Sequence, residues 1–169
     1  MKLILIIATC FALNAFAGPD HDMPAPKISA NFESLKALVG TWEGTNKMHG
    51  KEEKVKVTYE LTSGGTAIIE KMMPGTPHEM VSVYSNNGEQ VHMTHYCMLG
   101  NQPQMKLKRV DGSSFAFEMD GTKGIANKKE MHMHALVITL NGNKLKEEWT
   151  NYKDNKKGEM AIFEYTKKN

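Results

Sequence analysis

Arginine is almost absent from this chain: Arg109 is the single arginine beside 20 lysines. Sites that recognise phosphates or bases through two parallel hydrogen bonds usually depend on arginine. The formal net charge is only +2 at pH 7, and a near-neutral chain lacks the basic surface that nucleic acids require. We therefore expect no nucleic-acid partner.

Long apolar runs are also lacking. The longest covers Leu3 to Leu13, whereas a membrane-spanning helix needs about 20 apolar residues. Lys2 precedes this run and Ala15-Phe16-Ala17 follows it, which is the pattern of a cleaved signal peptide over residues 1–17. The sequence thus predicts export to the periplasm or the extracellular space, with no transmembrane segment in the mature chain. A lipid anchor at Cys10 is the alternative, disfavoured because Thr9 replaces the usual small residue.

Cysteine is scarce, with only Cys10 and Cys97 in the chain. Cleavage after residue 17 would leave Cys97 alone, so no internal disulfide can form and the core must stabilise the fold unaided. Cys97 is then either a small buried hydrophobic residue or a functional thiol.

Motifs of the common enzyme classes are missing too. The chain has no Gly-x-Ser-x-Gly, no glycine-rich phosphate loop, no His-Glu-x-x-His and no Cys-x-x-Cys. Carboxylates such as Glu70 and Glu147 are scattered among strands, and the sequence does not pair them. A binding protein is favoured over an enzyme, and no catalytic residue is predicted.

The mature chain begins with a leader and a helix. Residues 18–30 contain three prolines and few apolar residues, which indicates a flexible leader. Phe32, Leu35, Leu38 and Val39 then recur at helical spacing up to Gly40, with Asn31 or Ser29 as the N-cap. We expect one domain over residues 31–169 that opens with this helix.

After Gly40 the apolar period changes from 3.6 to 2. Residues 54–61 alternate strictly, and Asn86-Asn87-Gly88, Asp111-Gly112 and Asn141-Gly142-Asn143 are hairpin signals. About ten short strands follow one another with no helix between them. The sequence predicts an all-β fold, a closed antiparallel up-and-down β-barrel with one short N-terminal helix, and a β-sandwich is the alternative.

These residues also carry a family resemblance. A short helix leading into Gly40-Thr41-Trp42-Glu43-Gly44 and then only hairpins resembles the calycin-like barrels: lipocalins, fatty-acid-binding proteins and nitrobindin-like haem barrels. The segments 62–66, 74–80 and 94–97 look most like a group of small exported bacterial proteins without an assigned activity. The resemblance implies an interior cavity for a small apolar ligand and Trp42 packed across the closed end beneath the helix. It also makes haem an alternative cofactor, although residues 45–49 depart from the nitrobindin-like pattern.

The strand over residues 89–99 holds the densest group of reactive side chains. Alternation places Val91, Met93, His95, Cys97 and Leu99 on one face, which is the more apolar one and is expected to face the interior. His95 and Cys97 would then be able to converge on a bound group. The plainer alternative is a buried histidine beside an inert thiol.

A second group, Met131-His132-Met133-His134, supplies two histidines at i and i+2. His95, Cys97, His132 and His134 are together the candidate metal ligands, and thiolates and thioethers suit Cu(I). Periodicity does not say which face of this strand is inward. The alternative is that these side chains only fill the core.

Three polar side chains are expected near the barrel opening, where they would orient a ligand: His78, Tyr96 and Asn101. Tyr84 lies further along the His78 face, and Trp149 is a candidate wall of the cavity. Loop residues that only contact solvent would give the same pattern.

The predicted function is therefore an exported small-molecule-binding barrel with a largely apolar, unidentified ligand. The candidate ligand-binding residues are His78, Tyr84, Met93, His95, Tyr96, Cys97, Asn101 and Trp149. Two alternatives come from other classes. One is a copper or haem protein with ligands on the barrel wall, and the other is an enzyme with His78 or His95 as base and Tyr96 as acid.

Overall fold

A computed structural model describes residues 25–48 and 51–168 of the chain. The expected signal peptide over residues 1–17 and the first part of the expected leader lie outside these residues. Within them, no helix is both long enough and apolar enough to cross a membrane.

The ten strands of the described chain form one closed antiparallel barrel in which each strand pairs with its neighbours in sequence. The predicted up-and-down barrel is therefore confirmed, and the sandwich alternative is wrong. The strands are β1 (Gly40–Met48), β2 (Lys51–Thr62), β3 (Ala67–Met72), β4 (Met80–Asn87), β5 (Gln90–Tyr96), β6 (Gln104–Asp111), β7 (Ser114–Met119), β8 (His132–Asn141), β9 (Lys144–Lys153) and β10 (Lys156–Lys167).

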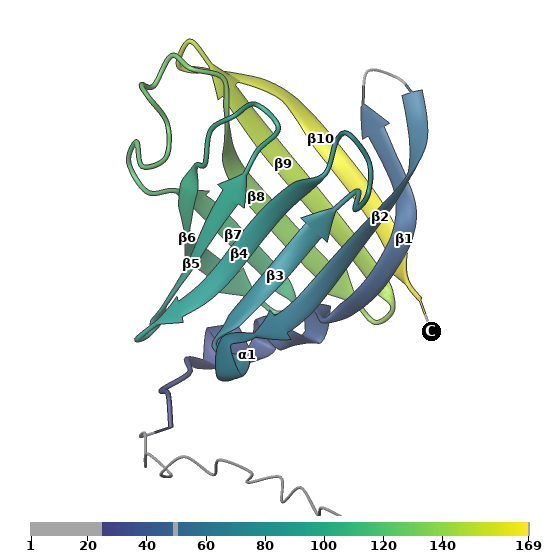
Figure 1. Ribbon diagram of the computed structural model, residues 1–169, viewed down its shortest axis with the longest axis vertical. Coiled ribbons are helices and arrows are strands. Elements are labelled where there is room, and N and C mark those ends of the chain that lie inside the picture. The colour runs from purple at the N-terminus through teal and green to yellow at the C-terminus, as the bar shows by residue number, and fades with distance from the viewer. Residues whose placement is uncertain (1–24, 49–50, 169) are drawn as a thin grey trace, which may run out of the picture.

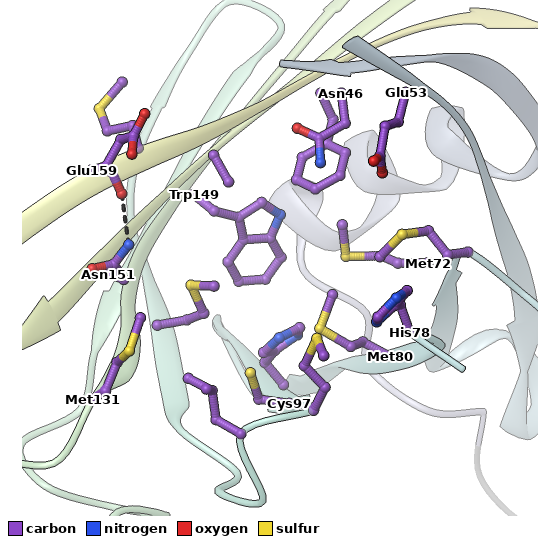
Figure 2. A pocket seen from close by; sticks show the side chains of 18 residues that line it. Asn46, Glu53, Met72, His78, Met80, Cys97, Met131, Trp149, Asn151 and Glu159 are labelled. Atoms are coloured by element: carbon purple, nitrogen blue, oxygen red, sulfur yellow. Dashed lines mark hydrogen bonds between the residues drawn. The ribbon is translucent and has the colours of Figure 1, made fainter. Parts of the chain in front are cut away.

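The two ends of the barrel differ (Figure 1). Helix α1 (Ala30–Leu35) and the 3₁₀ turn η1 (Lys36–Leu38) lie across the end that carries the short turns between β2 and β3, β4 and β5, β6 and β7, and β8 and β9. The other end carries the connections over residues 73–79, 97–103 and 120–131. A cavity opens there (Figure 2).

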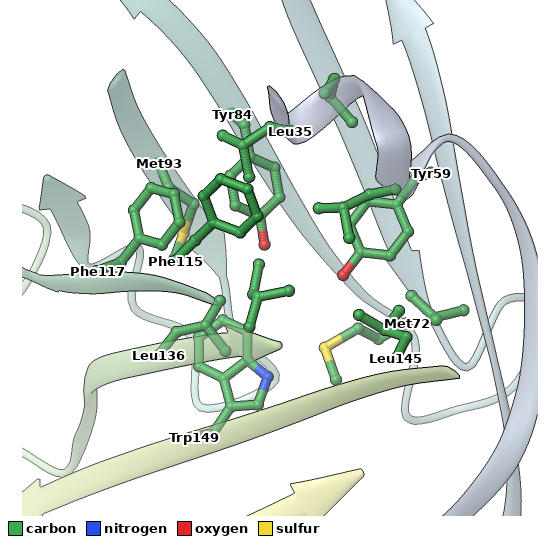
Figure 3. Close-up of a cluster of buried hydrophobic side chains, with 14 of the residues drawn as sticks. Leu35, Tyr59, Met72, Tyr84, Met93, Phe115, Phe117, Leu136, Leu145 and Trp149 are labelled. Atoms are coloured by element: carbon green, nitrogen blue, oxygen red, sulfur yellow. The ribbon is translucent and has the colours of Figure 1, made fainter. Parts of the chain in front are cut away.

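The interior near the helix is filled by large side chains that alternate along the strands. Tyr59, Tyr84, Phe117 and Leu136 are fully buried, and Figure 3 shows the hydroxyl groups of both tyrosines directed into the barrel. The rings of Tyr84 and Phe117 meet edge to face with centroids 5.5 Å apart. This half of the barrel is a packed core.

Helix α1 and the first strand close that core from below. Ser29 caps the helix by accepting a hydrogen bond from the Phe32 amide at 3.3 Å. Trp42 is fully buried and donates its indole N–H to the Leu38 carbonyl at 2.7 Å. The Lys167 ammonium lies 5.0 Å from the centre of the Trp42 ring on the same side of the barrel.

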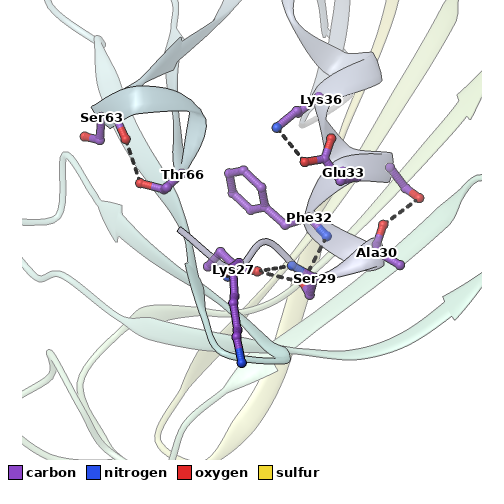
Figure 4. A network of polar contacts seen from close by, with 10 residues as sticks. Lys27, Ser29, Ala30, Phe32, Glu33, Lys36, Ser63 and Thr66 are labelled. Atoms are coloured by element: carbon purple, nitrogen blue, oxygen red, sulfur yellow. Dashed lines mark hydrogen bonds and ion pairs between the residues drawn. The ribbon is translucent and has the colours of Figure 1, made fainter. Parts of the chain in front are cut away.

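The segment before the helix, in which Figure 4 labels Lys27 and Ser29, is fixed to the barrel through Asn86. The Asn86 Oδ1 atom accepts hydrogen bonds from the amide of Ser29 at 2.9 Å and from its hydroxyl at 2.7 Å. The Asn86 side-chain amide donates to the Lys27 carbonyl at 2.8 Å. One hairpin side chain thus fixes the direction in which the chain enters α1.

We predict that Asn86→Ala lowers the free energy of unfolding by about 1–3 kcal/mol, because it leaves the partly buried amide and hydroxyl of Ser29 without their partner. Urea unfolding of the purified protein measures this change. Asn87→Ala is the matched control, since Asn87 is exposed at the next position of the same hairpin, and we expect it to stay within about 0.5 kcal/mol of the parent. Equal midpoints for both variants would contradict the anchoring role of Asn86.

Candidate functional site

The cavity at the open end has a volume of about 520 Å³. Its lining is mainly apolar and unusually rich in sulfur. The lining residues are Asn46, Glu53, Met72, Met73, His78, Met80, His95, Cys97, Met98, Leu99, Met131, Met133, Trp149, Asn151, Glu159, Met160, Ala161 and Phe163. A volume of this size lies within the range of about 300–1,000 Å³ that is common for small-molecule sites.

Four of the candidate ligand-binding residues line this cavity: His78, His95, Cys97 and Trp149. His95 and Cys97 are buried on the inward face of β5 and its continuation, as the alternation predicts. Leu99, expected on the same face, lies beyond the end of the strand at Tyr96 and is exposed, but it also lines the cavity. His78 is exposed at the mouth.

The other four candidates lie elsewhere. Tyr84 and Met93 are fully buried but do not line the cavity. Tyr96 points outward and its side chain is 51% exposed. Asn101 is buried and braces two loops by donating to Glu130 Oε1 and to the Met131 carbonyl, both at 2.8 Å. Asn101 therefore shapes the rim from behind rather than facing the cavity.

His132 and His134 do not join His95 and Cys97. Neither histidine lines the cavity. The distance from His132 Nε2 to His134 Nδ1 is 3.3 Å, and the His134 ring stacks on Tyr152. A bulge between Met133 and Ala135 interrupts the alternation of this strand, for which the sequence does not say which face points inward. Among residues 25–48 and 51–168, no group of three or more His, Cys, Asp or Glu side chains is placed to hold a metal ion.

A row of polar side chains crosses the interior directly below the cavity. Tyr59, Glu70, Ser82 and His95 are successive cross-strand neighbours on β2, β3, β4 and β5. All four are buried. Because side chains at paired positions share a face, these groups form a continuous inward-facing line between the packed core and the cavity.

Two buried carboxyl groups meet tyrosine hydroxyls in this region. Tyr59 donates to Glu147 Oε1 at 2.5 Å, and Tyr84 donates to Glu70 Oε2 at 2.8 Å. Burial raises the pKa of Glu70 to about 7. Burial, reinforced by the negative charge of Glu70, raises the pKa of Glu147 well above its usual range. The barrel interior therefore keeps protons on carboxyl groups that lose them in the unfolded chain.

His95 connects the polar row to the cavity. Its Nδ1 atom lies 3.0 Å from the Ser82 hydroxyl, whereas its Nε2 atom is buried without a protein partner. Burial lowers the pKa of His95 to about 4, so the ring is neutral at pH 7. The ring also packs against Trp149 with centroids 4.5 Å apart. Asn46 Oδ1 is a second buried atom without a partner on a residue that lines the cavity.

Sequence reasoning left Glu70 and Glu147 unassigned although a signal was present. Glu70 shares its strand face with Ile68 and Met72, and Glu147 shares its face with Leu145 and Trp149. A carboxylate at the inward position of an alternating strand indicates a buried acid. The sequence does not predict that Glu70 and Glu147 lie close enough to influence each other, because β3 and β9 are not neighbours in the sheet.

No protein-family model matches this chain, and no curated protein matches its sequence.

We predict that Glu147 makes the protein less stable as the pH rises. Its pKa is raised on folding, so its contribution to stability is complete below about pH 4.5 and is lost as the pH rises toward the folded-state pKa. In Glu147→Gln the side chain stays neutral throughout. The difference in unfolding free energy, variant minus parent, should therefore grow by about 1.4 kcal/mol per pH unit above pH 4.5 until that pKa is reached.

Urea unfolding of both proteins at several pH values from 5 to 8 measures this difference. The opposite contribution of His95, whose pKa is lowered on folding, is present in both proteins and cancels. Glu148→Gln is the matched control at the neighbouring outward position, where Glu148 pairs with Lys146. A difference for Glu147→Gln that does not change with pH would show that Glu147 ionises in the folded protein as it does in the unfolded chain.

Proposed function

We propose that this protein is an exported binding protein whose calycin-like barrel holds a small, largely apolar molecule at its open end. The single observation that carries the proposal is the cavity of about 520 Å³ with its mainly apolar lining. Burial of apolar ligand surface there supplies affinity at about 25 cal/mol per Å² before the costs of binding.

The closed end supports the calycin-like part of the proposal. The resemblance implies a helix across one end with Trp42 beneath it, and Trp42 does lie there with its N–H bonded to the Leu38 carbonyl. The signal-like residues 1–17 support export.

Two polar atoms give the ligand an orientation. Asn46 Oδ1 is a buried acceptor without a partner, and His95 Nε2 is a buried ring nitrogen without one. A ligand with an apolar body and one or two hydrogen-bonding groups would satisfy both atoms, which otherwise cost stability. We expect such a ligand rather than a pure hydrocarbon.

The positions of these side chains do not support the enzyme alternative. Its proposed acid, Tyr96, is exposed on the outer face and does not line the cavity with His95. No observation favours haem over another ligand, and haem stays a prediction from the resemblance.

We predict that partial filling of the cavity weakens binding of an apolar probe at least tenfold. Ala161 lines the cavity, so Ala161→Leu places three extra carbon atoms in it. The measurement is a fluorescence titration of the mature protein with the neutral probe N-phenyl-1-naphthylamine. Ala116→Leu is the control, since Ala116 is half-buried on β7 and does not line the cavity. Equal dissociation constants for the two variants, or no binding by the parent, would refute the proposed site.

A further inference from the structure

The cavity is richer in sulfur than an apolar ligand requires. Seven of the 13 methionines line it, together with Cys97. Leucine or isoleucine would supply the same apolar surface with better-defined rotamers. Methionine adds a polarisable thioether, which is both adaptable and a soft metal ligand.

Three of these sulfur atoms come from adjacent positions on one wall. Met72 and Met80 are direct partners on β3 and β4. Val81 pairs with Tyr96, so the same register places Met80 beside Cys97. Paired positions have Cβ atoms about 4.5–5.5 Å apart, which is within the combined reach of two methionine side chains. In Figure 2, Met72, Met80 and Cys97 point into the same space.

His95 adds a nitrogen to this group from two residues before Cys97. Its side chain is 1% exposed, and its Nε2 atom has no protein partner although the residue lines the cavity. Cβ atoms at i and i+2 on a strand lie roughly 6.6 Å apart. That spacing is too long for a direct histidine–thiol contact and is suitable for two ligands on either side of one ion.

The tautomer of His95 decides whether its Nε2 lone pair is free for a metal. Its Nδ1 atom lies 3.0 Å from the Ser82 hydroxyl, and either group can be the donor. In the tautomer that carries its proton on Nδ1, the ring donates to Ser82 and the Nε2 lone pair is free. Metal-binding histidines generally hold their second ring nitrogen in this way.

Burial raises the pKa of the Cys97 thiol, and hydrogen bonds from the backbone of Leu99 and Met98 oppose this effect. These bonds would stabilise the negative charge of a thiolate once a cation balances it. Cys97 is the one cysteine among the described residues, and it is buried and forms no disulfide there.

We propose that the cavity contains a Cu(I) site formed by His95 Nε2, Cys97 Sγ, Met80 Sδ and Met72 Sδ. Thiolate, thioether and imidazole donors are the set that selects Cu(I) over harder divalent ions. Binding forms a copper–sulfur bond to Cys97, and the thiol proton is released to solvent. The copper stays in the Cu(I) state, so no oxidant or reductant takes part. The proposal does not depend on an apolar ligand.

The test is an anaerobic titration of the mature protein with Cu(I), in competition with bicinchoninate. We expect one tightly bound Cu(I) per chain and at least tenfold weaker binding by the double variant Met72→Leu/Met80→Leu. Exchange of methionine for leucine removes sulfur while nearly conserving volume, so the fold and the apolar lining are kept.

The matched control is Met105→Leu/Met119→Leu. These methionines are also direct partners on adjacent strands and are also buried, but they do not line the cavity. The control should bind Cu(I) like the parent. Equal Cu(I) affinity in the two double variants, or no tight binding by the parent, would overturn the proposed site.

Cys97→Ser gives an independent readout. The parent should release one proton per Cu(I) bound, measured at neutral pH in weak buffer, and Cys97→Ser should release none. An unchanged proton release would remove Cys97 from the site.

The probe titration described above separates this proposal from the proposed function. That titration is carried out on the parent protein without copper, because Met72 and Met80 line the cavity and their exchange can alter probe binding too. If Cu(I) binding fails while probe binding stays intact, only the metal site is refuted. If probe binding fails while Cu(I) binds as expected, only the apolar-ligand proposal is refuted.

Discussion

Pairing of the first strand with the last is the constraint on which the rest of this structure depends. β1 and β10 are paired in register from Trp42 with Lys167 to Lys47 with Ile162. Gly44 allows the close approach, because a Cβ atom there would overlap the carbonyl oxygen of Glu164. This pairing removes both sheet edges and encloses one interior, so every inward side chain must contact the others or line a cavity.

The enclosed interior is divided by side-chain size and by the length of the connections. Near α1, aromatic side chains and Trp42 fill the space between strands joined by tight hairpins. At the other end, the connections over residues 73–79, 97–103 and 120–131 hold the rim apart. The methionine-rich lining leaves space there. The same strands run through both ends of the barrel. The cavity therefore results from the side chains that these strands place at each end.

Alternation along the chain predicted most of the architecture, and it failed where local geometry breaks the period. It identified the helix, the ten strands and the inward direction of His95 and Cys97. It could not orient His132 and His134, because a bulge between Met133 and Ala135 changes which residues face inward. It also gave no sign that Tyr59 meets Glu147, since that contact joins residues 88 positions apart in the sequence.

The polar row below the cavity connects the packed core to the cavity through buried polar side chains. Unpaired buried carboxyls are costly, yet Glu70 and Glu147 are held by Tyr84 and Tyr59 with their pKa values raised. The row ends at His95, where the hydrogen bonds run out and one nitrogen is left without a partner. Two buried atoms of the row have no protein partner, Glu70 Oε1 and His95 Nε2, and of these two residues it is His95 that lines the cavity. A bound molecule or ion at His95 Nε2 would therefore satisfy the one of these two atoms that a ligand in the cavity can reach.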